Sequence, residues 1–154
     1  MKKEIIQELY NGFEAAAVEV EDIECWSARE LQLLLGYSKW ENFSKVIEKA
    51  KIACGIAGYL VSDHFPDVRK MVNLGSGSER EIDDILLTRY ACYLIAQNGD
   101  PRKEQIAFAQ TYFAMQTRKA ELIEQRLLEI ERVKARTKLQ ETEKHLSGIL
   151  YERG

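Results

Sequence analysis

The sequence has 154 residues, 45% of them hydrophobic and 31% charged, which fits a soluble chain of one domain and an extension. It lacks an apolar run near the roughly 20 residues that a membrane span needs, and its first residues lack the apolar core of a signal peptide. A cytoplasmic protein without a membrane partner is therefore expected. The net charge of −3 divides into 11 basic and 17 acidic residues over 1–100, and into 11 and 8 over 101–154, so composition leaves nucleic-acid binding open.

Helical periodicity dominates the first fifty residues. Apolar residues repeat every three or four positions over about 3–17, which predicts an amphipathic helix. The alternation at 18–20 predicts a short extended piece. Ser27 can cap a second helix, which Gly36 ends, and a third helix is predicted to begin near Ser38 after a tight turn.

One β-hairpin is predicted near residues 68–85, because two alternating segments flank the flexible turn Gly75-Ser76-Gly77-Ser78. Residues 86–97 are nearly all apolar or aromatic, which predicts a helix buried on most sides. Asn98-Gly99 favours left-handed backbone angles, and Asp100-Pro101 supplies an N-cap and a first residue for the next helix. A sharp corner between two helices is expected there.

A long C-terminal helix is predicted from Pro101 onward, because no glycine or proline interrupts the sequence before Gly148. Apolar residues at alternating spacings of three and four predict a heptad seam, used first against the chain's own core and then in a homodimer. The candidate self-association residues are Phe113, Ala120, Ile123, Leu127 and Ile130. We therefore predict a mainly α fold (α+β), with a compact helical body over 1–122 that carries one small β-hairpin, and an extended helix over 123–154.

No catalytic, metal-binding or cofactor-binding site is predicted. The sequence has only two histidines, and its three scattered cysteines have no zinc-finger spacing and favour reduced thiols. His64 beside Asp63 is interpreted as a solvated loop histidine. Asp83-Asp84 is interpreted as capping the helix expected from residue 86, with a paired acid or magnesium site as the alternative.

Basic residues offer candidate sites for DNA or a protein partner. They lie at the predicted corner, farther along the long helix, and where the seam fades: Arg102, Lys103, Arg118, Lys119, Arg132, Lys134, Arg136 and Lys138. Helical spacing puts the last four on two faces, and interleaved glutamates favour a solvated helix over one polyanion-binding stripe. Trp40 lies among lysines, as aromatic residues do in single-strand binders, but its spacing favours core packing.

Two blocks of sequence carry a resemblance to a known family. Residues 26–43 read WSARELQLLLGYSKWENF, and residues 87–103 read LTRYACYLIAQNGDPRK, followed from Ala109 by AQTYFAMQTRKAEL. Over nearly all of residues 20–125 the chain resembles the DNA-damage-inducible protein D family, whose amino-terminal region is similar to BRO/antirepressor-type domains. The resemblance implies a damage-induced role that restrains a RecA-type recombinase and its strand exchange, without catalysis. Members of the family extend well beyond this length, so either a truncated form or a short relative is expected.

The predicted function is therefore that of a non-enzymatic regulator. Its expected partners are a RecA-type recombinase or its filament on DNA, and DNA itself. The leading alternative is a phage-like antirepressor or DNA-binding transcriptional regulator, suggested by the related amino-terminal domain and the turn between Leu31 and Lys49. The acidic balance of residues 1–100 weighs against strong autonomous DNA binding. A nucleic-acid enzyme, a third class, would depend on Asp83 or Asp84.

Overall fold

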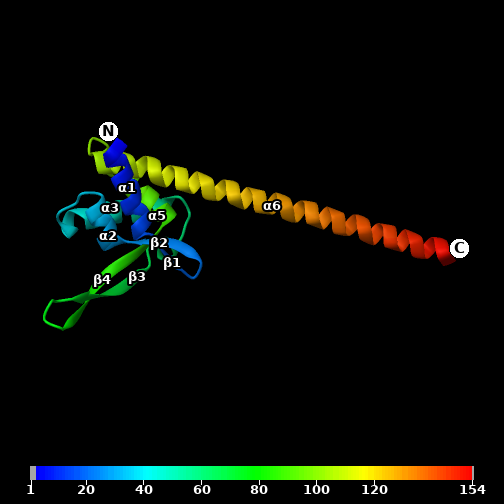
Figure 1. Ribbon diagram of the computed structural model, residues 1–154, viewed down its shortest axis with the longest axis horizontal. Coiled ribbons are helices and arrows are strands. Elements are labelled where there is room, and N and C mark those ends of the chain that lie inside the picture. Colours follow the sequence, from blue (N-terminus) through cyan, green and yellow to red (C-terminus); the bar gives the residue numbers. More distant parts are fainter. Residues whose placement is uncertain (1–2, 154) are drawn as a thin grey trace. The chain divides into compact units, whose positions relative to one another are not determined.

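A computed structural model describes the backbone of residues 3–153 and the side chains of residues 3–144. The chain forms two units, Met1–Thr117 and Arg118–Gly154, each described below by itself. Among the helices described, none combines the length and the apolar character that crossing a membrane requires. The elements, labelled in Figure 1, are α1 (Lys3–Ala16), β1 (Val18–Val20), β2 (Ile23–Ser27), α2 (Ala28–Leu34), α3 (Trp40–Ile56), α4 (Val61–His64), β3 (Asp67–Asn73), β4 (Glu79–Thr88), α5 (Arg89–Gln97) and α6 (Glu104–Arg153).

The sheet of the first unit is antiparallel, and the described strands follow the order β1-β2-β4-β3. The predicted mainly helical fold with a β component and the hairpin near 68–85 are confirmed, and this β3–β4 hairpin extends away from the helices (Figure 1).

The prediction of a single hairpin is wrong, because β1 and β2 form another. They are joined by Glu21 and Asp22, whose φ angles of 52° and 66° make a tight turn without glycine. Glutamate and aspartate are not strong indicators of such a turn, so the pattern of apolar residues did not predict the β1–β2 hairpin.

Two strands of the sheet lead directly into helices. Strand β2 ends at Ser27, which caps α2 as predicted by accepting a hydrogen bond from the Glu30 amide at 3.5 Å. Strand β4 ends at Thr88, which caps α5 by accepting one from the Ala91 amide at 3.2 Å. Helix α5 therefore begins three residues later than predicted, since the apolar residues 86–87 pair with β2 instead.

The core of the first unit forms around Trp26, which is fully buried. Its ring packs edge-on against Phe113 of α6 at 5.1 Å, and its indole Nε1 donates to the Phe13 carbonyl of α1 at 2.9 Å. The Tyr112 hydroxyl donates a hydrogen bond to the Glu14 carboxylate at 2.5 Å, so that α6 and α1 are also joined by a polar contact. Phe113, predicted to belong to the heptad seam, is thus committed to the core of its own unit.

The α5–α6 corner, residues 98–103, differs from the expected geometry. Helix α6 begins at Glu104, and residues 101–103 form a turn before it. Asn98 has a right-handed φ of −89°, so the left-handed backbone predicted at Asn98-Gly99 is wrong there. Gly99 is needed for space instead, because a Cβ atom at this position would lie 2.8 Å from Ile106 of α6.

The second unit, Arg118–Gly154, is the remainder of α6. The predicted boundary between body and extension, at residues 122–123, falls within this helix. Ile123, Leu127 and Ile130 of the predicted seam are exposed by 52%, 56% and 46% of their surface, and Ala120 is half-buried. The later part of the predicted seam is therefore open on the surface of this unit.

Candidate functional site

The predicted basic residues of the α5–α6 corner have different surroundings. The Arg102 guanidinium contacts both carboxylate oxygens of Asp100, with nitrogen–oxygen distances of 3.0 to 3.2 Å. These hydrogen bonds lower the pKa of Asp100 below its ordinary value and keep that carboxylate charged. The charge of Arg102 is thereby compensated locally. The Lys103 ammonium forms no ion pair with a described residue and lies 5.0 Å from the centre of the Tyr37 ring.

The contact between Lys103 and Tyr37 joins the corner to the α2–α3 turn, residues 35–39. Gly36 in this turn has a φ of +80° and ends α2 as predicted, and a Cβ atom there would lie 3.4 Å from Gln105 of α6. Lys39 is exposed at the end of the turn and has no ion pair with a described residue. Two segments that are some sixty residues apart in sequence thus meet at Tyr37, and each carries an exposed lysine.

A second cation–π contact lies beside the first. The Arg29 guanidinium of α2 lies 3.9 Å from the centre of the Trp40 ring, and its Nε donates to the Asp83 carbonyl at 3.1 Å. Trp40 is half-buried and packs against Phe43, with ring centres 5.9 Å apart. Tyr37 contacts the same phenylalanine at 5.2 Å, so one buried ring supports both aromatic residues. The predicted packing of Trp40 against the core is confirmed, and the other contact of this ring is with the Arg29 guanidinium.

These side chains form the surface that we call the basic–aromatic surface: Arg29, Tyr37, Lys39, Trp40 and Lys103. Two neighbouring carboxylates already have partners, since Asp100 contacts Arg102, and Glu30 lies 3.6 Å from Lys70. Residues 29–41 contain one further acidic residue, Glu41 at the start of α3, which has no ion pair within the described residues. Chemically, such a surface can bind phosphates through its lysines and stack planar groups on its aromatic residues and guanidinium.

The remaining predicted cations belong to the second unit and are exposed. Arg118 lies 3.5 Å from Glu121, one helical turn away, whereas Lys119 forms no ion pair with a described residue. The four cations beyond the seam, Arg132, Lys134, Arg136 and Lys138, alternate between two faces of the helix and form no ion pairs with described side chains. The structure does not gather these four into one basic stripe, and their binding role stays a prediction.

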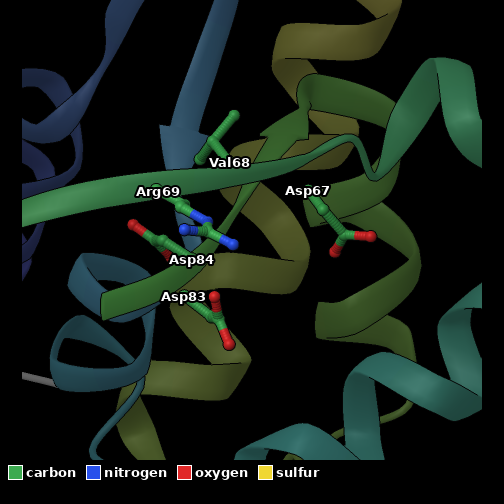
Figure 2. A pocket seen from close by; sticks show the side chains of 5 residues that line it. All are labelled: Asp67, Val68, Arg69, Asp83 and Asp84. Atoms are coloured by element: carbon green, nitrogen blue, oxygen red, sulfur yellow. The ribbon is translucent and has the colours of Figure 1, made fainter. Parts of the chain in front are cut away.

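Residues of the paired strands β3 and β4 line a hollow: Asp67, Val68, Arg69, Asp83 and Asp84 (Figure 2). Asp84 is buried, and its carboxylate accepts hydrogen bonds from the Ser27 hydroxyl and from the amides of Arg29, at 3.1 Å, and Ile85, at 2.8 Å. It therefore caps α2, whereas the sequence predicted that it caps the helix after β4. Its neighbour Asp83 is exposed on the strand.

The acids of this hollow do not assemble a metal site. Successive side chains of a strand point to opposite faces, and the Asp84 oxygens already have partners. Within the described residues, no group of three histidine, cysteine, aspartate or glutamate side chains could hold a metal ion. Burial also raises the pKa of the thiols of Cys25, Cys54 and Cys92, which keeps them in the unreactive protonated form.

His64 is not the solvated loop residue that the sequence suggested. It ends α4, is half-buried, and contacts the rings of Tyr59 and Tyr90, with centres 5.6 and 5.0 Å away, while the two tyrosine rings also contact each other at 4.9 Å. Its Nδ1 lies 2.7 Å from the Thr88 hydroxyl, which caps α5. Burial lowers the pKa of His64 below its ordinary value, although the Asp63 charge opposes this shift.

Residues 16–114 match the N-terminal domain of the BRO family. This chain belongs to the BRO family. DNA damage-inducible protein D of Escherichia coli (strain K12) is 54% identical over 99 residues, which make up 64% of the chain but only 36% of that relative. No solved structure shows a significant match. The BRO match contains the whole basic–aromatic surface, and it confirms the family predicted from residues 26–43 and 87–103.

Sequence reasoning found part of this surface. The sequence indicated Lys103 and, separately, Trp40 among lysines, but it gave no sign that these residues meet and none of Arg29 or Tyr37. The missing information is the contact between the α2–α3 turn and the α5–α6 corner, which depends on tertiary packing. Gly36 indicated the turn in the sequence, but not the segment that the turn contacts.

Proposed function

We propose that this BRO-family chain is a non-enzymatic regulator of the DNA-damage response that restrains a RecA-type recombinase on DNA, in the cytoplasm. The observation that carries the proposal is the basic–aromatic surface, which lies entirely within residues 16–114. The 54% identity to a DNA damage-inducible protein supports the biological setting. That relative is much longer than the aligned segment, so its whole activity is carried over here only as part of the proposal.

The proposed mechanism is occupation of the recombinase–DNA filament without covalent chemistry. Lys39 and Lys103 would contact backbone phosphates, since both are free of ion pairs with described residues. The guanidinium of Arg29, whose central carbon lies 3.9 Å from the centre of the Trp40 ring, is a planar group on which an exposed base could stack. Such contacts would favour unstacked single strands, the kind of DNA that a recombinase holds.

The proposal is tested by a strand-exchange assay with a RecA-type recombinase and increasing amounts of the chain. The wild-type chain is expected to slow strand exchange, and the double variant Lys39→Glu/Lys103→Glu to lose most of this effect. Arg80→Glu is the matched control, because Arg80 is exposed on β4 outside the basic–aromatic surface. Unchanged strand exchange at a saturating amount of wild-type chain would rule the recombinase role out.

A second candidate function is that of an antirepressor-like, DNA-binding transcriptional regulator. The match to the BRO N-terminal domain favours it, and α2 and α3 form a helix pair around a tight turn. This function predicts binding to duplex DNA with a strong dependence on salt, and each phosphate-binding lysine should contribute about 1 to the salt slope. Duplex binding that equals or exceeds single-strand binding, without an effect on strand exchange, would favour this candidate over the first.

A further inference from the structure

Part of the exposed apolar surface of the second unit follows a heptad, whereas Leu122, Leu128, Val133 and Leu139 are exposed outside its a and d positions. In the usual notation, Ala120 and Leu127 occupy positions a, and Ile123 and Ile130 occupy positions d. The last three of these are each about half exposed. An apolar stripe of this kind on one helix is normally covered by another helix.

The charges beside this stripe have opposite signs on its two flanks. Lys119 and Arg126 occupy positions g, and Glu124 and Glu131 occupy positions e. None of these four side chains forms an ion pair with another described residue, whereas Arg118, outside the flanks, pairs with Glu121. The flanks are therefore available to a partner helix.

The order of these charges fits a second copy of the chain in one orientation. In a parallel, in-register pair, each g residue faces the e residue five positions later on the other helix. Lys119 then meets Glu124 of the partner subunit, and Arg126 meets Glu131 of the partner subunit, on both sides of the two-fold axis. An antiparallel pair would place basic flank against basic flank and acidic against acidic, which is repulsive.

We infer that residues 119–131 form a parallel, in-register homodimer seam. Its first boundary is set by Phe113, which is buried in the core of the first unit. Its second boundary is Lys134, which occupies the next a position and interrupts the apolar stripe. Lys134 itself lies outside the seam. Leu127 at a with Ile130 at d is a pattern that also favours bundles of three or four helices, and we assign two helices because a dimer is the smallest assembly in which each flanking charge has a partner. This inference does not depend on the proposed recombinase role.

The seam is tested first by the mass of the full chain in light scattering over a series of concentrations. The wild-type chain should reach twice the mass of one chain, and Leu127→Lys should remain a monomer. Leu128→Lys is the matched control, since Leu128 is as exposed, at 53% against 56%, but lies outside the a and d positions. A monomeric wild-type chain, another stoichiometry, or equal effects of both substitutions would overturn the inference.

The orientation is tested by exchanging the charged flanks. Lys119→Glu/Arg126→Glu makes both flanks acidic and should abolish the dimer, and adding Glu124→Lys/Glu131→Lys should restore it. All four side chains lie on the surface of the second unit, and circular dichroism checks that the variants stay helical. Loss without restoration, or no loss, would contradict the parallel register. Neither result would bear on the proposed effect of the first unit on strand exchange by a recombinase.

Discussion

The carboxylate of Asp84 connects strand β4 of the sheet to helix α2. It reaches from β4 to the start of α2, where it satisfies the Ser27 hydroxyl and the Arg29 amide. Ser27 in turn caps the same helix, so two residues far apart in sequence share one helix N-terminus. The pair Asp83-Asp84 indicated a capping role, but sequence spacing alone pointed to the wrong helix, because the strand pairing that brings β4 beside β2 is a long-range contact.

Replacing Asp84 by alanine should lower the free energy of unfolding by about 1–3 kcal/mol, since a buried hydroxyl and a helix amide lose their acceptor. The measurement is urea denaturation followed by tryptophan fluorescence, which reports on buried Trp26. Asp83→Ala is the control and should change stability by less than about 0.5 kcal/mol, because its side chain is exposed. Equal losses for the two variants would show that Asp84 has no special structural role.

His64 links α4 to the cap of α5. Its proton affinity is lowered mainly by burial among the aromatic rings of Tyr59 and Tyr90. Because its pKa is lower in the folded than in the unfolded state, the unfolded state binds more protons once the pH falls below the ordinary value of 6.5. The contribution of neutral His64 to stability is therefore complete above this pH and declines as the pH falls toward the folded-state pKa.

The free energy of unfolding should decrease between about pH 7.5 and about pH 5.5, and His64→Gln should flatten this part of the profile. Denaturation curves at several pH values measure the effect, and NMR titration of the His64 ring gives its pKa directly. A folded-state pKa above 6.5, or a profile that His64→Gln leaves unchanged, would contradict the assignment.

At the scale of elements, the α5–α6 corner depends on the absence of a side chain at position 99. Ile106 of α6 fills the space next to Gly99, and the neighbouring Lys103 then reaches Tyr37. The sequence predicted a corner here but attributed glycine to backbone angles. The close approach could not be predicted, because it depends on which side chain the next helix presents.

Gly99→Ala should destabilise the chain by about 1–3 kcal/mol through the clash with Ile106, and it should weaken the effect on strand exchange by displacing the corner. Gly55→Ala in α3 is the matched control. Its Cβ would meet nothing closer than Val61 at 4.0 Å, so a helical glycine is replaced without strain and stability should rise by about 0.4–1 kcal/mol. Thermal denaturation compares the two, and a neutral Gly99→Ala would argue against the tight corner.

Elements with strong local signals were predictable. Helices α1 and α2 and the β3–β4 hairpin follow from periodicity, a cap and a glycine-rich turn. Strands β1 and β2 are short, and residues 86–88 belong to β4 because Leu86 and Leu87 have partners in β2. A short apolar run of this kind is predicted as helix when its partner strand is not known, since the spacing of apolar residues cannot distinguish a buried strand from a buried helix.

At the scale of the whole molecule, the two units carry the two surfaces that we propose for binding. The basic–aromatic surface of the first unit is assembled from α2, the α2–α3 turn, α3 and the α5–α6 corner. The heptad of the second unit lies on one helix, so its residues and flanking charges could be read from the sequence without any tertiary information. The first surface could not, because its lysines come from distant segments.

The central claim, occupation of a recombinase–DNA filament, is tested most directly by sedimentation of the chain with RecA-type filaments assembled on single-stranded DNA. The chain should sediment with the filaments in a saturable way, and Lys39→Glu/Lys103→Glu should largely remain in solution while Arg80→Glu sediments like the wild type. If the wild-type chain stays in solution at every filament concentration, the account of its function is contradicted.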